Sequence, residues 1–257
     1  MNSELLIERI DDHFVSIIIN RPAALNAINR PVMEGLLTFF TENRGQNDIH
    51  GVVISGAGEK AFAAGADITQ FTEVDEKEGA SLSALGHEAF NAIESFHVPV
   101  IAAVNGFALG GGCELAMACH MRVVTKKAKF GQPEVNLGLV PGYGGTQRLP
   151  QLIGKGRALE LLLTADMIDA QKALEWGLAN EVVEPSEELS KALEILKKIA
   201  TKGPQAISQI IELVNSHYHD PKSFTKEIHT FGKLLTTDEC IEGVEAFLEK
   251  RKANFRK

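Results

Sequence analysis

The stretch Gly106-Phe107-Ala108-Leu109-Gly110-Gly111-Gly112-Cys113-Glu114-Leu115-Ala116-Met117-Ala118 decides how this chain is interpreted. The apolar run 98–104 before it predicts a buried strand, and the apolar residues after the glycines predict a helix. Glycines let a ligand approach the backbone closely, and the first N–H groups of a helix have no partner within it. The amide of Gly111 or Gly112 is therefore a candidate donor to a developing oxyanion, with Glu114 in the first helical turn. Considered alone, a triple glycine is more often a tight strand-to-helix turn without catalytic function.

A second segment repeats this design: Phe62-Ala63-Ala64-Gly65-Ala66-Asp67-Ile68. A short extended piece with small side chains precedes a predicted helix start, so the amide of Ala66 is a second candidate oxyanion donor. Small residues at 63–65 would let a flat chemical group lie against the backbone. Close packing of two segments is the alternative explanation for small residues at these positions.

A second glutamate, Glu134, ends the segment Phe130-Gly131-Gln132-Pro133-Glu134, and the glycine-rich stretch 141–148 follows it. Pro133 keeps Glu134 out of the middle of a helix and predicts a shaped loop. Most glutamates in loops are simply solvated, but this one shares its glycine-rich surroundings with Glu114. Two carboxylates around one water can act as base and acid if their environments hold different protonation states.

The first half of the chain alternates predicted strands and helices, and its strands are apolar enough to be covered on both faces. We expect strands at 5–10, 14–19, 52–55, 62–64, 98–104 and 122–125, and helices at 29–43 and 83–96. Beyond about residue 144 the pattern is helical apart from a strand at 181–183, and it ends in helices at 204–218, 221–235 and 238–252. The acidic segment 73–79 is expected to be a mobile surface segment. These patterns predict an α/β core over residues 1–202 and a helical region over 203–257.

Composition indicates a globular chain that can bury a large core, with 257 residues of which 44% are hydrophobic and 23% charged. Its net charge of −8 argues against a nucleic-acid-binding surface, which would show a basic stripe. No apolar run reaches membrane-spanning length, and residues 1–4 do not resemble the start of a signal peptide. The cysteines Cys113, Cys119 and Cys240 lack disulfide spacing, which is typical of a reducing compartment. We therefore expect a cytoplasmic protein without nucleic-acid or membrane partners.

Metal ligands are not expected, because the histidines are scattered along the chain. His217 and His219, with Asp220, would point to different faces of a helix. The basic carboxyl tail, residues 249–257, reverses the sign of the charge locally. It fits either a phosphate contact or a solvated chain end.

Five motifs in this order resemble the crotonase superfamily, and specifically the enoyl-CoA hydratases. They are Asn20-Arg21-Pro22 through Asn26-Ala27, the segments 63–68, 110–116 and 130–134, and Pro141-Gly142 through Arg148. The ending Ala246-Phe247-Leu248-Glu249-Lys250-Arg251 fits as well. The resemblance covers nearly the whole chain and includes both glutamates at the family spacing. It implies a spiral of ββα units and a carboxyl-terminal helical region that assembles trimers, usually paired as hexamers.

The resemblance also implies a reaction, the reversible syn addition of water to a trans-2-enoyl-CoA. It places the thioester oxygen between the amides of Ala66 and Gly111. Glu114 would orient and deprotonate the water for attack at C3, and Glu134 would supply the proton to C2. No cofactor and no metal are implied, since CoA is part of the substrate. The further substrate-binding residues that it implies are Ala64, against the adenine, together with Asp67, Ile68, Gly142 and Lys250.

Three residues depart from the family pattern. His120 stands where many members carry aspartate, and Thr69 stands where some carry a lysine, which puts a phosphate contact there in doubt. Tyr143 replaces a small residue. Our hypothesis is that this ring narrows the pocket or lines the acyl tunnel.

Other functions remain as alternatives at this point. An enoyl-CoA isomerase or another specialised acyl-CoA lyase of the superfamily uses the same oxyanion hole, but an isomerase commonly manages with one carboxylate here. Dehydration of a 3-hydroxyacyl-CoA uses the same site in reverse. An RNA-binding relative would need a basic helix, whereas residues 191–198 are mixed in charge. A non-catalytic acyl-CoA-binding protein is disfavoured because both carboxylates are present.

Overall fold

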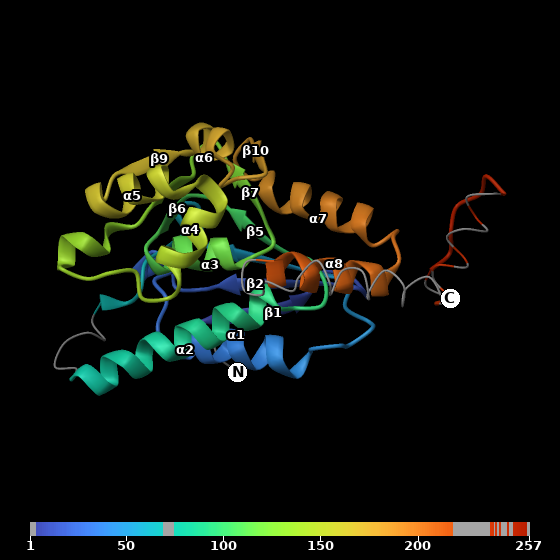
Figure 1. The fold of residues 1–257 in the computed structure, drawn as a ribbon, viewed down its shortest axis with the longest axis horizontal. Coiled ribbons are helices and arrows are strands. Elements are labelled where there is room, and N and C mark those ends of the chain that lie inside the picture. The colour runs from blue at the N-terminus through green and yellow to red at the C-terminus, as the bar shows by residue number, and fades with distance from the viewer. Residues whose placement is uncertain are drawn as a thin grey trace.

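Two β-sheets organise the chain in the computed structural model, which describes residues 4–68, 75–217, 237, 238, 240, 242, 246 and 249–255 (Figure 1). The six-stranded sheet has the order β1 (Leu5–Arg9), β2 (Phe14–Ile19), β3 (Gly51–Gly56), β5 (Val100–Val104), β7 (Met121–Thr125) and β10 (Glu181–Val183). The four-stranded sheet has the order β4 (Ala61–Ala64), β6 (Phe107–Leu109), β8 (Lys129–Gly131) and β9 (Met167–Asp169).

From β3 to β8, successive strands alternate between the two sheets, and this alternation defines the fold. The pairs β3 and β4, β5 and β6, and β7 and β8 each give one strand to either sheet, and each new strand joins the previous one in parallel. A helical segment follows each pair: α2 (Glu76–Glu94), α3 (Gly111–Ala118) and the 3₁₀ helix η3 (Pro133–Leu137). This is a spiral of ββα units, so the fold predicted from the sequence is confirmed.

The remaining helices cover the sheets. They are η1 (Pro22–Ala24), α1 (Arg30–Glu42), α4 (Gly145–Ile153), α5 (Lys155–Thr164), α6 (Ala170–Trp176), α7 (Glu188–Ile199) and α8 (Pro204–His217). Amphipathic α7 lies on one face of the six-stranded sheet, where Ala192 and Leu196 pack against Val53, Ile101 and Val123. The larger core lies on the other face, beneath α1, α2 and α3. Because β5 is covered on both faces, all five of its residues are buried.

Several expected elements are confirmed by their local chemistry. The hairpin of β1 and β2 is antiparallel over residues 5–9 and 15–19. Asn29 caps α1 by accepting a hydrogen bond from the Val32 amide at 3.1 Å, and Pro31 occupies the first turn. The helix predicted at 204–218 is α8.

The start predicted for α2 was wrong, because this helix begins at Glu76 rather than near residue 83. Asp75 accepts from the Glu78 amide at 2.8 Å, and the Glu78 carboxylate accepts from the Asp75 amide at 3.3 Å. This capping box turns residues 75–79 of the expected mobile segment into a helix start. Residues 73 and 74, and Thr69, lie outside the described residues.

Three short strands were not expected, namely β6, β8 and β9. Each has only three residues, too few for an alternating pattern to be detected. Glu134 lies in the first turn of η3 rather than on an irregular loop. The helix predicted at 221–235 lies outside the described residues, as does much of the one predicted at 238–252. The division at residues 202 and 203 stays a prediction.

Candidate active site

The triple glycine joins β6 to α3 at a point where two backbones meet. Gly110 has a φ of +48° and donates its N–H to the Gly131 carbonyl at 2.9 Å. A Cβ on Gly112 would lie 1.9 Å from the Ala63 carbonyl oxygen. The amino terminus of α3 therefore packs directly on β4, and only a residue without a side chain allows this approach.

The two candidate oxyanion donors, Ala66 and Gly111, lie side by side. A Cβ built on Gly111 would lie 3.3 Å from the Ala66 nitrogen. Ala66 forms a parallel bridge with Ile28, whose N–H donates to the Gly65 carbonyl at 2.8 Å and whose carbonyl accepts from the Asp67 amide at 2.9 Å. This pairing directs the Ala66 N–H away from residue 28. Within the described part of the chain, neither of the two donor N–H groups has a hydrogen-bond acceptor.

The amino-terminal motif around Asn26 holds this strand end in place. Asn26 is 1% exposed, and its amide donates to the carbonyls of Ala57 at 2.9 Å and Ala61 at 2.8 Å. Arg21 forms an ion pair of 2.8 Å with Asp67. The sequence analysis identified this motif only as part of a resemblance. Its contacts show that it fixes the backbone on both sides of Ala66, and that the Asp67 carboxylate is engaged with Arg21.

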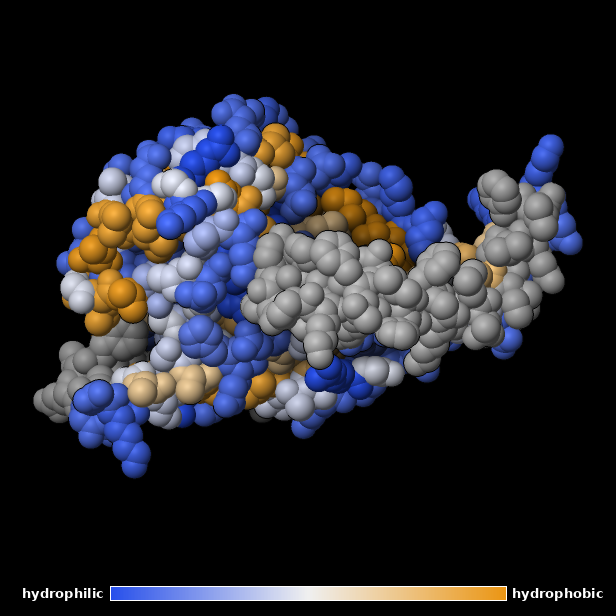
Figure 2. Space-filling model, in the orientation of Figure 1, coloured by the Kyte–Doolittle hydropathy of each residue, from blue (hydrophilic) through white to orange (hydrophobic). Residues whose placement is uncertain are grey.

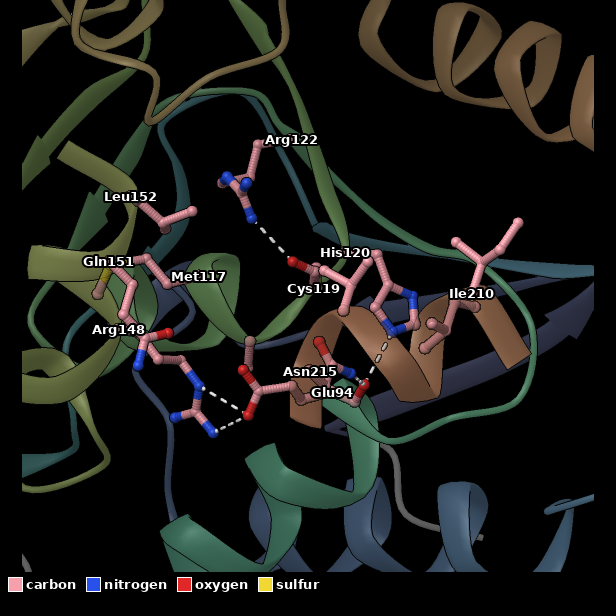
Figure 3. Close-up of a pocket in the computed structure, with 13 residues that line it drawn as sticks. Glu94, Met117, Cys119, His120, Arg122, Arg148, Gln151, Leu152, Ile210 and Asn215 are labelled. Atoms are coloured by element: carbon pink, nitrogen blue, oxygen red, sulfur yellow. Dashed lines mark hydrogen bonds and ion pairs between the residues drawn. The ribbon is translucent and has the colours of Figure 1, made fainter. Parts of the chain in front are cut away.

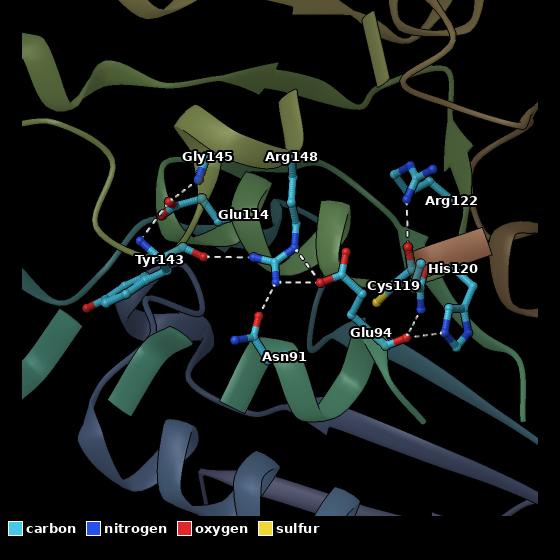
Figure 4. Close-up of polar contacts among 10 residues, drawn as sticks. Asn91, Glu94, Glu114, Cys119, His120, Arg122, Tyr143, Gly145 and Arg148 are labelled. Atoms are coloured by element: carbon cyan, nitrogen blue, oxygen red, sulfur yellow. Dashed lines mark hydrogen bonds and ion pairs between the residues drawn. The ribbon is translucent and has the colours of Figure 1, made fainter. Parts of the chain in front are cut away.

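Glu114 is a buried carboxylate with fixed orientation. Its side chain is held at Oε1, which accepts from the backbone N–H groups of Tyr143 at 2.8 Å and Gly145 at 2.7 Å (Figure 4). Burial raises the pKa of Glu114 to about 7, and the nearby Glu134 charge adds to this rise while the two N–H donors oppose it. A carboxyl with this pKa can exchange a proton near neutral pH.

Glu134 approaches the first glycine of the triple glycine. A Cβ on Gly110 would lie 2.7 Å from Glu134 Oε1, so glycine at this position gives the carboxylate its space. Burial raises the pKa of Glu134 as well. With the Gln132 amide turned so that its nitrogen faces the carboxylate, this nitrogen lies 3.1 Å from both oxygens of Glu134.

Both glutamates face one cavity of about 510 Å³. Its polar wall comes from β4 and its following turn, the start of α3, η3 and the 141–143 turn. Its apolar wall includes Leu82, Leu137, Leu139 and Val140. Figure 2 shows apolar side chains gathered around α5. Among the exposed apolar residues, Leu163 on α5 is 68% exposed and Val140, which follows η3, is 75% exposed. The cavity thus joins a polar centre to an apolar rim.

Most residues predicted for the site meet at this cavity. The lining includes Glu114, Glu134, Ala64, Ala66, Ile68, Gly111 and Gly142. Asp67 is not part of the lining, and neither is Lys250, which is exposed. In Figure 1 the terminal segment that carries Lys250 lies beyond α8, away from α3.

The contribution of α2 to the cavity was not predicted from the sequence. Ser83 and His87 line it, and the Ser83 hydroxyl donates to the Gly142 carbonyl at 2.6 Å. Burial lowers the pKa of His87, and the charge of Arg148 acts in the same direction. Both residues lie within the helix predicted at 83–96, but they follow no sequence motif that would show which face of this helix meets the cavity.

His120, one of the departures from the family pattern, lies away from the cavity. Its Nδ1 accepts from the Val100 amide at 2.9 Å, and its Nε2 donates to the Glu94 carbonyl at 2.9 Å. The imidazole thus satisfies a backbone carbonyl at the end of α2 and a backbone N–H at the start of β5. Burial lowers its pKa, in keeping with the neutral form that these two hydrogen bonds require.

The described ranges hold neither a cluster of metal ligands nor a membrane-spanning helix. These residues contain no group of three or more His, Cys, Asp or Glu side chains arranged to hold a metal ion. Nor do they contain a helix that combines the length and apolar character of a membrane span. The thiols of Cys113 and Cys119 are buried and free, and burial raises the pKa of each to about 12.

Comparison with known proteins agrees with this geometry. The enoyl-CoA hydratase/isomerase family model matches residues 9–257. The chain is 43% identical to a crotonyl-CoA hydratase of Syntrophomonas wolfei over 99% of both chains. It is 44% identical to a short-chain-enoyl-CoA hydratase of Clostridium acetobutylicum over 92% of this chain and 91% of the relative. The crystal structure of an enoyl-CoA hydratase from Bacillus anthracis superposes with a TM-score of 0.93 at 36% identity, covering 98% of each chain. The chain belongs to the enoyl-CoA hydratase/isomerase family.

Proposed function

We propose that this protein is an enoyl-CoA hydratase, a hydro-lyase that adds water to a trans-2-enoyl-CoA to give the 3-hydroxyacyl-CoA. The observation that carries the proposal is the pairing of Glu114 and Glu134 in one cavity beside two N–H donors. Full-length relatives named as crotonyl-CoA and short-chain-enoyl-CoA hydratases, at 43% and 44% identity, support the same reaction.

In the proposed mechanism the thioester oxygen lies between the N–H groups of Ala66 and Gly111. Attack of water at C3 moves negative charge onto this oxygen, and the two donors stabilise the enolate-like state. Glu114 takes the proton of the attacking water. Its carboxylate is held in one orientation for this step, because Oε1 accepts from two backbone amides. Glu134 gives a proton to C2, and burial helps it by raising its pKa. The reverse direction, dehydration, uses the same groups in exchanged roles.

The presence of two carboxylates, Glu114 buried and Glu134 half-buried, favours hydration over isomerisation of the double bond. An isomerase moves one proton between two carbons, which a single carboxylate can do, whereas hydration needs a base for water and an acid for carbon. Burial raises the pKa of Glu114 to about 7 and also raises the pKa of Glu134, which favours proton exchange by both groups.

The test is hydration of crotonyl-CoA by the purified protein, followed as loss of the enoyl-thioester absorbance. Rapid loss of this absorbance is expected. A β,γ-unsaturated thioester of the same length should give no rapid conversion to the conjugated isomer. The opposite pattern, isomerisation without hydration, would move the assignment to an isomerase.

Shortening Tyr143 to alanine is expected to extend the range of accepted acyl chains. The ring is 8% exposed, lines the cavity and packs edge-on against Phe90 with centroids 5.8 Å apart. A Cβ on Gly86 would lie 2.1 Å from the ring, so α2 leaves room for it there. Removing the ring should raise kcat/KM for an eight-carbon enoyl-CoA relative to crotonyl-CoA by about 10-fold.

The measurement for Tyr143 is a series of enoyl-CoA chain lengths, with Tyr143→Phe as the matched control. Phenylalanine keeps the ring, and alanine keeps the backbone N–H that binds Glu114. The control should therefore retain the wild-type profile. Identical profiles for wild type and Tyr143→Ala would refute the role of the ring.

We further propose a homotrimer, or a hexamer of two trimers, in which residues 203–257 form the assembly region. Exposed apolar residues such as Ile210 at 60% and Val214 at 57% on α8 support a contact surface there. A cytoplasmic location is part of the same proposal. Light scattering on the intact chain tests the assembly, and a monomeric mass would refute it.

A further inference from the structure

We propose that Arg148 is a positioning residue for Glu114. Its guanidinium ties the turn at 143–145 to α2 and places a positive charge near the Glu114 carboxylate. This inference rests on the proposed function, because it assigns Arg148 a part in the hydration that Glu114 would catalyse. It concerns a side chain that does not line the cavity of the two glutamates.

Arg148 is a buried cation that makes four hydrogen bonds. Its side chain extends from α4 and is 6% exposed. Nη2 donates to Asn91 Oδ1 at 2.7 Å and to Glu94 Oε2 at 2.8 Å, and Nε donates to the same Glu94 oxygen at 3.2 Å (Figure 4). Nη1 donates to the Tyr143 carbonyl at 3.0 Å. One guanidinium therefore joins the last turns of α2 to the 143–145 turn.

The same turn holds the Glu114 carboxylate. Tyr143 accepts from Arg148 with its carbonyl and donates to Glu114 with its N–H, and Gly145 adds the second N–H. Between them, Gly144 has a φ of +106°, and a Cβ there would lie 2.4 Å from Arg148 Nη1. Because the guanidinium packs against this backbone, displacing it would displace both donors to Glu114.

Glu94, the partner of Arg148, is itself held in place. Its backbone carbonyl accepts from His120 Nε2 at 2.9 Å and from Asn215 Nδ2 at 2.6 Å. Figure 3 shows these side chains around a second cavity, of about 300 Å³, behind the Arg148–Glu94 pair. The ion pair of 2.8 Å thus involves a residue whose backbone is held by His120, just before β7, and by Asn215 on α8.

Arg148 also influences the pKa of Glu114 through its charge, and Glu94 is paired with that charge. Glu114 is faced by Glu134 from η3, by Tyr143 from the turn and by Arg148 from α4. The positive charge of Arg148 lowers the pKa of Glu114, against the effect of burial. Glu94 partly neutralises Arg148, and His87 on α2 has its pKa lowered by burial and by Arg148. Removing the charge of Arg148 and removing that of Glu94 should therefore act on Glu114 in opposite directions.

The experiment is the pH profile of kcat/KM for crotonyl-CoA hydration in wild type, Arg148→Gln and Glu94→Gln. Activity requires ionised Glu114, so it falls on the acid side of its pKa. Arg148→Gln should move this acid limb to higher pH by about one unit. It should also lower kcat/KM about 100-fold at the optimum, because the turn is displaced. Glu94→Gln, which leaves Arg148 less neutralised, should move the limb to lower pH.

Two more variants separate this role from simple stability. Arg148→Lys keeps the positive charge but lacks the several N–H donors of the guanidinium. The acid limb of the pH profile should therefore stay at the wild-type pH while kcat falls. Arg122 is the matched control, because it is 3% exposed and donates to the Ala116 and Cys119 carbonyls rather than to the turn. Arg122→Gln should lower the melting temperature and leave the limb unmoved.

The outcomes distinguish this inference from the proposed function. An active wild type whose acid limb is unchanged in both Arg148→Gln and Glu94→Gln would overturn the positioning role alone. Shifts of the two limbs in the same direction would also overturn it. A wild type that does not hydrate crotonyl-CoA would overturn the proposed function, and this role with it.

Discussion

Replacing Glu114 with glutamine should lower kcat for crotonyl-CoA hydration by about 10³-fold or more. The amide has nearly the shape of the carboxylate, and its carbonyl oxygen can still accept from the Tyr143 and Gly145 amides at 2.8 and 2.7 Å. The geometry of the site is therefore expected to survive. What is lost is the ability to take a proton from water, so KM should change little while kcat falls.

Glu134→Gln should produce a comparable loss, because the amide cannot give a proton to C2. The double variant should be little slower than either single variant, since the two groups act in the same step. Turnover is measured by the loss of enoyl-thioester absorbance, with the melting temperature as a check on folding. Glu88→Gln is the matched control, because this carboxylate is exposed on the same helix whose inner residues line the cavity. Activity that survives both catalytic substitutions would place the chemistry on other residues.

The centre of the site was predictable because its features are local in sequence. A glycine run before an apolar helix indicates an exposed helix start, and the glutamates stand a few residues from such runs. The fold was predictable for a related reason, because strands as apolar as residues 100–104 require cover on both faces. The structure adds that one cavity contains both glutamates.

The side-chain contacts that hold the site in place could not be predicted from residue patterns. Arg148 meets Glu94 and Asn91 across 54 and 57 residues of sequence, and no periodicity encodes such a meeting. Asn26 likewise acts through backbone carbonyls 31 and 35 residues away. Side-chain contacts of this kind depend on how the ββα units stack, so they become visible only when the fold is known.

The missed start of α2 has a different cause. Residues 73–79 are rich in charge, which is typical of a solvated segment, and Gly79 weakens the helical pattern. The Asp75 and Glu78 pair overrides both signals, because it satisfies two amides that a helix start leaves free. Reading the capping box before the charge run would have extended the helix to the residues that line the cavity.

Replacing Gly112 with alanine should disrupt both the stability and the oxyanion hole. The new Cβ would lie 1.9 Å from the Ala63 carbonyl oxygen and 2.6 Å from its carbon. Both are backbone atoms of a buried strand, so no side chain can move aside. The start of α3 must shift away from β4 instead, which separates the Gly111 amide from Ala66. We expect a destabilisation of about 3 kcal/mol and a fall in kcat of about 100-fold or more from the lost donor.

The matched control for this prediction is Gly156→Ala on α5, where a Cβ would meet no atom within 4 Å. Alanine there should leave activity unchanged and raise stability by up to about 1 kcal/mol, because glycine disfavours helix. Urea unfolding and crotonyl-CoA turnover are measured on both variants. If Gly112→Ala keeps wild-type kcat, the Gly111 amide does not act as an oxyanion donor. If it keeps both kcat and stability, the close approach of α3 to β4 is not what the triple glycine provides. A loss of kcat that exceeds the loss of folded protein would separate the oxyanion effect from unfolding. The control shows what the same glycine-to-alanine change does at a site remote from the cavity.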